Sequence, residues 1–130
     1  MIVVDASALL HSLLRTPVAN AIDALLLDSG RTLHAPHLID VEAAQVIRRY
    51  AAAREIEPER GREALANLAA FPLQRYPHGD LLPRIWELRD NFTVYDAAYV
   101  ALAEMLDAAL LTRDARLTEA ARKHTRIALV

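Results

Sequence analysis

Ile2-Val3-Val4-Asp5-Ala6-Ser7-Ala8-Leu9-Leu10 opens the chain with a short β-branched run that ends at an acidic residue and continues directly into an apolar stretch. The run before Asp5 predicts a buried strand, and Ser7 is a candidate N-cap for a helix that carries Leu10 and Leu14 on one face. The segment therefore predicts a strand followed at once by a helix, with Asp5 at the junction.

The same alternation of short strands and helices continues along the chain. Further strands are predicted at residues 33–35, 73–76, 109–112 and 127–130. Further helices are predicted from Pro17 to a stop at Ser29-Gly30, and at residues 37–54, 58–70, 80–89, 93–106 and 115–123. In the helix at 80–89, Ile85 and Leu88 are expected to face inward, and Trp86 is expected to be a packing residue rather than an anchor for a partner. This order predicts an α/β fold with a mainly parallel sheet of four or five strands, covered by helices on both faces and joined by right-handed crossovers.

Length and composition limit the class of protein. The chain has 130 residues, of which 54% are hydrophobic and 25% charged, so we expect one globular domain over residues 1–130. A formal net charge of -2 means that any contact with nucleic acid must come from a local basic cluster. The absence of cysteine excludes disulfides and thiolate metal sites. The apolar stretches are too short and too charged for an export signal or a membrane span, which predicts a cytoplasmic protein.

Four acidic residues fall where this topology would bring them together. A helix that follows a parallel strand begins at the carboxyl edge of the sheet, which is also where ligands bind. Asp5 ends the first strand and Asp114 follows the fourth, whereas Glu42 and Asp96 lie in the early turns of their helices. All four side chains can therefore reach one edge of the sheet.

Each acid also has an ordinary structural explanation. Asp5 and Asp114 would suit helix N-caps, Asp96 would suit the positive end of a helix dipole, and Glu42 would suit a half-exposed helix position. Glu42 and Asp96 nevertheless border the apolar stripes of their helices, where a carboxylate is costly unless it is paired, hydrogen-bonded or bound to a metal. Independent capping residues also need not share one cleft. The combination favours a cation site.

Four stretches of the chain carry a family resemblance. They are Val4-Asp5-Ala6-Ser7-Ala8-Leu9, the segment at residues 36–42 with Pro at its start and Glu at its end, Tyr95-Asp96-Ala97-Ala98-Tyr99-Val100-Ala101-Leu102-Ala103, and Leu111-Thr112-Arg113-Asp114. In this order and spacing they resemble the PIN domain, and within it the VapC-type toxins of bacterial type II toxin–antitoxin pairs. The resemblance implies a compact three-layer α/β/α fold, a metal-dependent ribonuclease, a homodimer, and a cognate VapB-type antitoxin that blocks the active site.

The resemblance also implies roles for particular residues. Asp5, Glu42, Asp96 and Asp114 match the acidic quartet of the family, and Ser7 and Thr112 match polar positions beside it. Some relatives carry another acid two residues after Asp114, where this chain has Arg116, so a second metal ion is less expected than the first.

Carboxylates on separate elements suit Mg²⁺ or Mn²⁺, which prefer oxygen ligands and keep several waters. The predicted direct ligands are Asp5, Asp96 and Asp114. Glu42 is predicted to bind through water or to orient the attacking water. Ser7 and Thr112 would hold carboxylates or waters in place.

Arg113 and Arg116 flank Asp114 and are candidates for phosphate contacts, although solvated surface charge explains them as well. Few aromatic residues are present, so RNA would be recognised through its shape and backbone rather than by base stacking. The apolar faces near residues 22–27 and 38–50 would suit an antitoxin segment or, more simply, the core.

Two other functions remain open for this sequence. The same metal chemistry would serve a PIN-like nuclease that acts on DNA, and an acidic pocket would also serve a regulatory module that binds a cation without catalysis. A receiver domain is disfavoured because no acidic pair follows the first strand. A phosphatase with an Asp-x-Asp nucleophile is disfavoured because Ser7 stands at the second acidic position.

Overall fold

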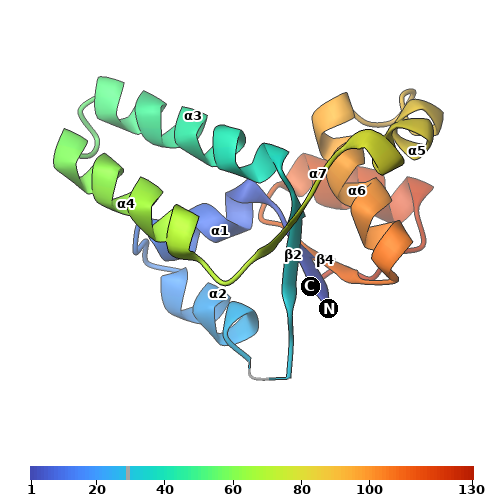
Figure 1. Ribbon diagram of the computed structural model, residues 1–130, viewed down its shortest axis with the longest axis horizontal. Helices are drawn as coiled ribbons and strands as arrows, with labels where there is room; N and C mark the ends of the chain where they lie inside the picture. Colours follow the sequence, from blue (N-terminus) through green and yellow to red (C-terminus); the bar gives the residue numbers. More distant parts are fainter. Residues whose placement is uncertain (29) are drawn as a thin grey trace.

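A four-stranded parallel sheet forms the centre of the molecule in a computed structural model that describes residues 1–28 and 30–130 (Figure 1). The spatial order β3-β2-β1-β4 joins β1 (Ile2–Val4), β2 (Leu33–Pro36), β3 (Gln74–Tyr76) and β4 (Ala109–Leu111). Each pairing between neighbouring strands is parallel. The predicted α/β class with a parallel sheet is confirmed.

Helices cover both faces of this sheet, as Figure 1 shows, with α1 to α4 on one side and α5 to α7 on the other. The helices are α1 (Ala6–Leu13), α2 (Ala19–Leu26), α3 (Leu38–Ala52), α4 (Pro58–Ala70), α5 (Leu82–Glu87), α6 (Val94–Leu106) and α7 (Ala115–His124), with a short 3₁₀ turn η1 (Gly79–Leu81) before α5. No helix in the described part of the chain is both long enough and apolar enough to cross a bilayer.

Burial in the core explains the positions of two apolar segments, β1 and α6. β1 pairs on both sides, and its residues Ile2, Val3 and Val4 are at most 1% exposed, as expected for a central parallel strand. Residues 97–103 of α6 are all buried, and four of them are alanines. A helix that is apolar on every side must lie inside the protein, so α6 is held firmly between the sheet and its neighbours.

Several predicted details of the elements were wrong. The helix after β1 begins at Ala6 with Asp5 as its N-cap, so Ser7 is not the cap. The second helix begins at Ala19, after Pro17, and ends at Leu26. Its predicted stop involves Ser29, which lies outside the described residues.

The predicted strand at residues 127–130 is only an isolated parallel bridge between Leu110 and Leu129. Its backbone hydrogen bonds to β4 both involve Leu110, whose N–H donates to the Ala128 carbonyl and whose carbonyl accepts from the Val130 N–H. Ile85 and Leu88 are buried as predicted, whereas Trp86 is 67% exposed and has the Arg89 guanidinium 4.3 Å from its ring centroid. Since α5 has only six residues, it buries one face and leaves Trp86 on the other.

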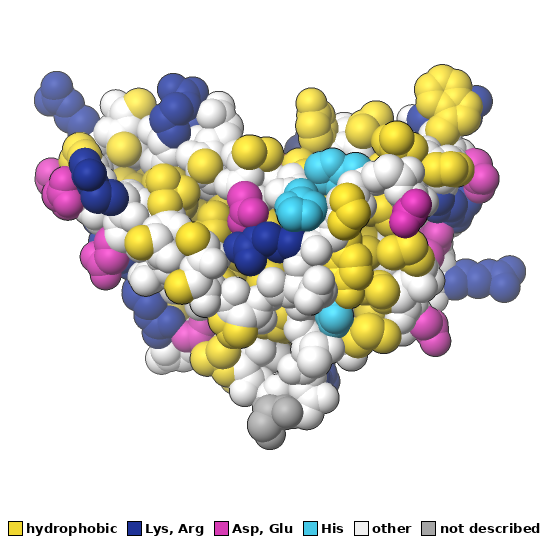
Figure 2. Space-filling view, in the orientation of Figure 1, with side chains coloured by type: hydrophobic (Ala, Val, Ile, Leu, Met, Phe, Trp, Pro, Cys, Tyr) yellow, Lys and Arg dark blue, Asp and Glu magenta, His cyan; other side chains and the backbone are white. Residues whose placement is uncertain are grey.

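The carboxyl ends of the strands lie at the top of the view in Figure 1, where α1, α3, α6 and α7 begin. The surface above them is hollowed between the two groups of helices (Figure 2). This edge of the sheet therefore gathers the helix starts that carry the predicted acids.

Candidate active site

All four predicted acids line one cleft of about 550 Å³ at this edge. They reach it from different elements: Asp5 from the end of β1, Glu42 from the second turn of α3, Asp96 from the first turn of α6, and Asp114 from the start of α7. Parallel topology brings these residues together although the first and last are more than a hundred positions apart in sequence.

Asp5 is the most deeply held of the four, at 5% exposed. Its Oδ1 accepts hydrogen bonds from the Ser7 hydroxyl at 2.7 Å and from the Ala8 backbone N–H at 3.1 Å. Its Oδ2 accepts from the Thr112 hydroxyl at 2.5 Å. The carboxylate is therefore both the N-cap of α1 and a fixed member of the cleft.

Ser7 and Thr112 join the start of α1 to the loop between β4 and α7. Their hydroxyl oxygens are 3.3 Å apart, and each also accepts a backbone bond from that loop, from Arg113 to Ser7 at 2.8 Å and from Asp114 to Thr112 at 3.0 Å. Both side chains lie beside Asp5, the location that the sequence predicted for them.

Asp114 is half-buried and caps α7. Its Oδ1 accepts from the backbone N–H groups of Arg116 at 2.9 Å and Leu117 at 3.4 Å. Both bonds end on the same oxygen, and none of the hydrogen bonds found among the described residues involves Oδ2. Asp114 is thus both the N-cap of α7 and part of the cleft lining.

Glu42 and Asp96 are half-buried and come from helices on opposite sides of the sheet. The Tyr99 hydroxyl, on the same face of α6 as Asp96, donates to Glu42 Oε1 at 2.5 Å. Thr93 caps α6 by accepting from the Asp96 backbone N–H at 3.1 Å. Sequence reasoning gave no role to Tyr99 or Thr93, although the i, i+3 spacing of Asp96 and Tyr99 would have placed Tyr99 at the cleft.

Burial raises the pKa of Asp5, of Glu42 and of Asp96 above the ordinary values of these carboxyls. Nearby negative charge adds to the rise, from Asp114 on Asp5 and on Asp96, and from Asp5 and Asp96 on Glu42. Hydrogen bonds from Thr112 and Tyr99 oppose it. Burial and the Glu42 charge also raise the pKa of Tyr99 far above its usual range, so its phenol stays protonated and can donate. The cleft would therefore be stabilised by a positive charge.

The donor set fits a divalent cation with an open coordination shell. Among the described residues, no three Asp, Glu, His or Cys side chains are drawn together as a ready-made cage. Mg²⁺ commonly binds one or two carboxylates, keeps several waters and takes further oxygens from a substrate phosphate. Carboxylates that surround a shared, solvent-accessible cleft suit this mode of binding.

Arg113 and Arg116 are exposed beside the cleft. The Arg116 charge is near enough to Asp96 to oppose part of the rise in the Asp96 pKa, which burial dominates. Neither arginine is ion-paired in the described part of the chain.

Comparison with known proteins gives the family. The PIN domain matches residues 2–123. Ribonuclease VapC9 of Mycobacterium tuberculosis is 44% identical over 130 residues, which cover 100% of this chain and 98% of VapC9. The crystal structure of M. tuberculosis VapC20, described as a sarcin-ricin loop cleaving toxin, has a TM-score of 0.71 at 14% identity and covers 92% of this chain and 95% of its own.

VapBC2 from Rickettsia felis, bound to a promoter DNA fragment, has a TM-score of 0.69 at 12% identity, with 100% of this chain and 98% of its own covered. These two distant structures support the fold alone, whereas VapC9 shows the closer relationship. The chain therefore belongs to the PIN-domain family and, within it, to the VapC ribonucleases, the toxins of VapBC toxin–antitoxin systems.

Proposed function

We propose that this chain hydrolyses RNA phosphodiester bonds at the acidic cleft with the help of a bound divalent cation, Mg²⁺ or Mn²⁺. The observation that carries the proposal is the convergence of Asp5, Glu42, Asp96 and Asp114 on one cleft, with burial and mutual repulsion raising the pKa of three of them. Such a cluster is unfavourable for the metal-free protein, and a cation would relieve it.

The residues divide into those that would hold the cation and those that would act on water. Asp5, Asp96 and Asp114 would provide its carboxylate ligands. When bound, the cation would polarise the scissile phosphate and lower the pKa of a water molecule. Ser7 and Thr112 would keep the Asp5 carboxylate oriented, as their bonds of 2.7 and 2.5 Å suggest.

Glu42 would orient the attacking water and accept its proton. Its raised pKa suits a general base better than that of an ordinary surface carboxylate would. Tyr99 would hold Glu42 in one orientation through its hydroxyl. As the water oxygen bonds to phosphorus, the bond from phosphorus to the leaving oxygen breaks, and that oxygen takes up a proton from solvent. Arg113 or Arg116 would bind the substrate phosphates.

The proposed partners follow from the VapC relationship. A VapB-type antitoxin would cover the cleft and exclude substrate, and toxin, antitoxin and RNA would meet in the cytoplasm. The chain would act as one catalytic domain in each copy of a homodimer.

The side formed by α5 and the start of α6 supports such a dimer, because it exposes four large apolar residues: Leu82, Trp86, Val94 and Tyr95. Figure 2 shows hydrophobic side chains gathered on this part of the surface. Trp86→Glu should shift the protein toward monomer in light scattering, whereas the exposed control Leu65→Glu on α4 should not. Equal masses for both variants and the parent would contradict this dimer.

Cleavage of total RNA tests the catalytic proposal. The wild-type protein should cut RNA with Mg²⁺ or Mn²⁺, lose that activity with a chelator, and lose it again as Asp96→Asn. Equal cleavage by Asp96→Asn would refute the site. Cleavage of single-stranded DNA without cleavage of RNA would point instead to a DNA nuclease.

A further inference from the structure

Residues 113–126 form a basic part of the chain. This segment, here named the basic segment, contains five Lys or Arg residues and two acids, in a chain whose formal net charge is -2. It starts beside the cleft, continues through α7 and ends at the opposite edge of the sheet. All five cations are exposed, and they are Arg113, Arg116, Arg122, Lys123 and Arg126.

Helix stability explains only part of this charge. Arg122 and Lys123 lie in the last turn of α7, where cations interact favourably with the helix dipole. Arg116 lies in the first turn, where the same dipole disfavours a cation, and Arg126 lies beyond the helix. In the described part of the chain neither of these two arginines is ion-paired.

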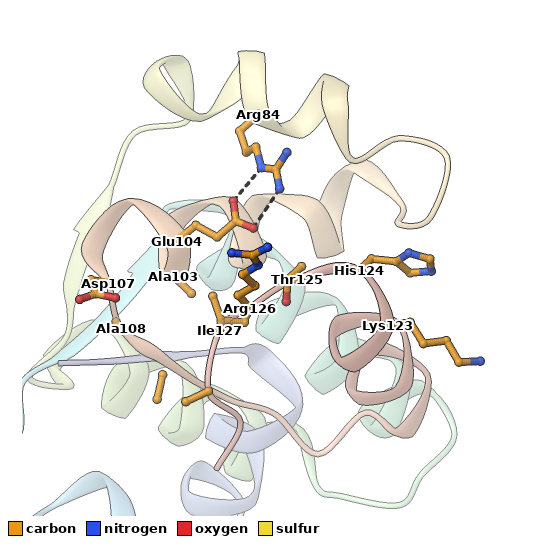
Figure 3. Close-up of a pocket in the computed structure, with 12 residues that line it drawn as sticks. Arg84, Ala103, Glu104, Asp107, Ala108, Lys123, His124, Thr125, Arg126 and Ile127 are labelled. Carbon is orange, nitrogen blue, oxygen red and sulfur yellow. Dashed lines mark hydrogen bonds and ion pairs between the residues drawn. The ribbon is translucent and has the colours of Figure 1, made fainter.

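The far end of the basic segment borders a cavity of about 830 Å³ between α6, α7 and the chain that follows α7. Figure 3 shows Arg126 and Thr125 from the basic segment facing the same space as Arg84 and Glu104. The Arg84 guanidinium binds both carboxylate oxygens of Glu104, at 2.7 and 3.1 Å, and so neutralises that acid. Lys123 also lines the cavity, where the three cations Arg84, Lys123 and Arg126 outnumber the two acids Glu104 and Asp107 by one.

A shallow depression along the outer face of α7 adjoins this cavity and begins at Ala115, the residue after Asp114 of the cleft. It is lined by Arg116 at one end and by Lys123 and His124 at the other, and the last two residues also line the cavity. The ten residues of α7 span about 15 Å, enough to follow several nucleotides of a strand. Glu119 on this face is paired with Lys123 at 3.1 Å.

We propose that the outer face of α7 and the cavity beyond it form a second RNA site, which binds the phosphate backbone of the substrate outside the cleft. This inference rests on the proposed ribonuclease function. Arg126 would bind phosphate through its planar fork of N–H groups, and Lys123 would act as a point charge. Such contacts bind any sequence and weaken as salt rises.

Binding of a long unstructured RNA tests the second site. Binding is measured with the Asp96→Asn protein and a chelator, so that the RNA is not cleaved during the measurement. Adding Lys123→Gln and Arg126→Gln should weaken binding several-fold and reduce the slope of log affinity against log salt by about 1.4, since each lost contact to a single strand removes roughly 0.7. The matched control is Arg62→Gln, which removes an exposed arginine from α4.

An oligonucleotide short enough to occupy only the cleft should bind the Lys123→Gln/Arg126→Gln protein as tightly as its parent. Equal affinity and equal salt slope for the double variant and the Arg62→Gln control on long RNA would overturn the second site. So would unchanged RNA binding together with lost binding of the antitoxin, which would assign this face to a protein partner.

Cleavage and binding together also distinguish the ribonuclease proposal from the second RNA site. Cleavage of RNA by the wild type with an unchanged salt slope in the double variant would overturn only the second site. Failure of the wild type to cleave RNA would overturn the ribonuclease proposal and this inference with it. Circular dichroism checks that both variants are folded.

Discussion

Asp5 accepts hydrogen bonds from the start of α1 and from Thr112, which lies 107 positions away in sequence. One oxygen caps the helix while the other accepts from Thr112, just after β4, so one carboxylate is both an N-cap and part of the cleft. Asp114 combines a cap and a cleft position in the same way. At the scale of the residue, capping holds Asp5 and Asp114 in fixed orientations.

Thr112→Val should weaken both stability and activity. The substitution removes the 2.5 Å hydrogen bond from Thr112 to the buried Asp5 carboxylate. In the wild type this bond lowers the Asp5 pKa and so opposes the larger rise that burial causes. We expect the free energy of unfolding to fall by about 1–3 kcal/mol in urea titrations, with a loss of RNA cleavage. Thr16→Val, which removes a hydroxyl bonded to His11 Nδ1 in the turn after α1, should leave cleavage unchanged. Equal activity of the two variants would contradict the role given to Thr112.

Tyr99→Phe should change the pH dependence of cleavage. The Tyr99 hydroxyl bond opposes the rise in the Glu42 pKa that burial causes, so its removal should raise that pKa further. If Glu42 must be ionised to accept a proton, the acidic limb of the rate profile should move to higher pH, with activity about 10- to 100-fold lower. Tyr50→Phe, on the exposed side of α3, is the control and should keep the parent profile. A Tyr99→Phe profile identical to that of the control would argue against Glu42 as the base.

At the scale of the element, α3 depends on side chains from β3 and the turn after it. The backbone N–H of Leu38 donates to His78 Nε2 at 3.1 Å, and Arg75 Nε donates to both carboxylate oxygens of Asp40 at 2.9 and 3.0 Å. The residue at the N-cap, His37, forms no side-chain capping bond. The start of the helix that carries Glu42 is therefore fixed by residues about 40 positions away.

His78→Ala should loosen the start of α3. Loss of this remote cap should lower the free energy of unfolding by about 1 kcal/mol and reduce RNA cleavage through misplacement of Glu42. His37→Ala is the matched control, because His37 is exposed and its side chain caps nothing. Urea unfolding and cleavage rates check both variants, and equal losses in the two would show that His78 has no special role.

At the scale of the whole molecule, the cleft carries a charge that opposes folding. Burial raises the pKa of Asp5, Glu42 and Asp96 above their values in the unfolded chain, so the folded state binds protons more tightly. The free energy of unfolding should then fall as pH rises from the unfolded to the folded pKa values, and the full loss should be present above the folded ones. A chain with carboxylates paired to cations would show the opposite trend.

Mg²⁺ or Mn²⁺ should therefore stabilise the protein at neutral pH and much less at acidic pH, where protons already relieve the repulsion. A cation concentration 100 times its dissociation constant should add about 2.7 kcal/mol. Asp96→Asn should melt at a higher temperature than the metal-free wild type and gain less from the cation. Thermal unfolding with and without chelator measures both effects. A wild type that melts at the same temperature with and without cation would exclude a site in this cleft.

Local patterns predicted much of the fold and the location of the candidate site. The helix at Pro58–Ala70 has the predicted ends, and its start follows from Pro58, which suits a first turn. The helix α6 begins at Val94, within the predicted start. The terminal segment was predicted wrongly because an apolar β-branched run indicates burial, and Ile127 and Leu129 are partly buried without forming a full ladder. Trp86 was also misjudged, since the direction in which a short helix faces depends on what packs against it.

The sequence by itself determined the alternation of strands and helices, the parallel sheet, and the edge at which the four acids meet. These follow from neighbouring residues, through β-branched runs, apolar periodicity and caps, and from the geometry of parallel strands. Only the tertiary structure decided which side chains hold the acids: Thr112 for Asp5, Tyr99 for Glu42 and His78 for the start of α3. These partners are 40 to 107 positions apart in sequence, and they meet only because the sheet packs distant segments together. The raised pKa values have the same origin, because burial and the distance between charges are properties of the packed molecule.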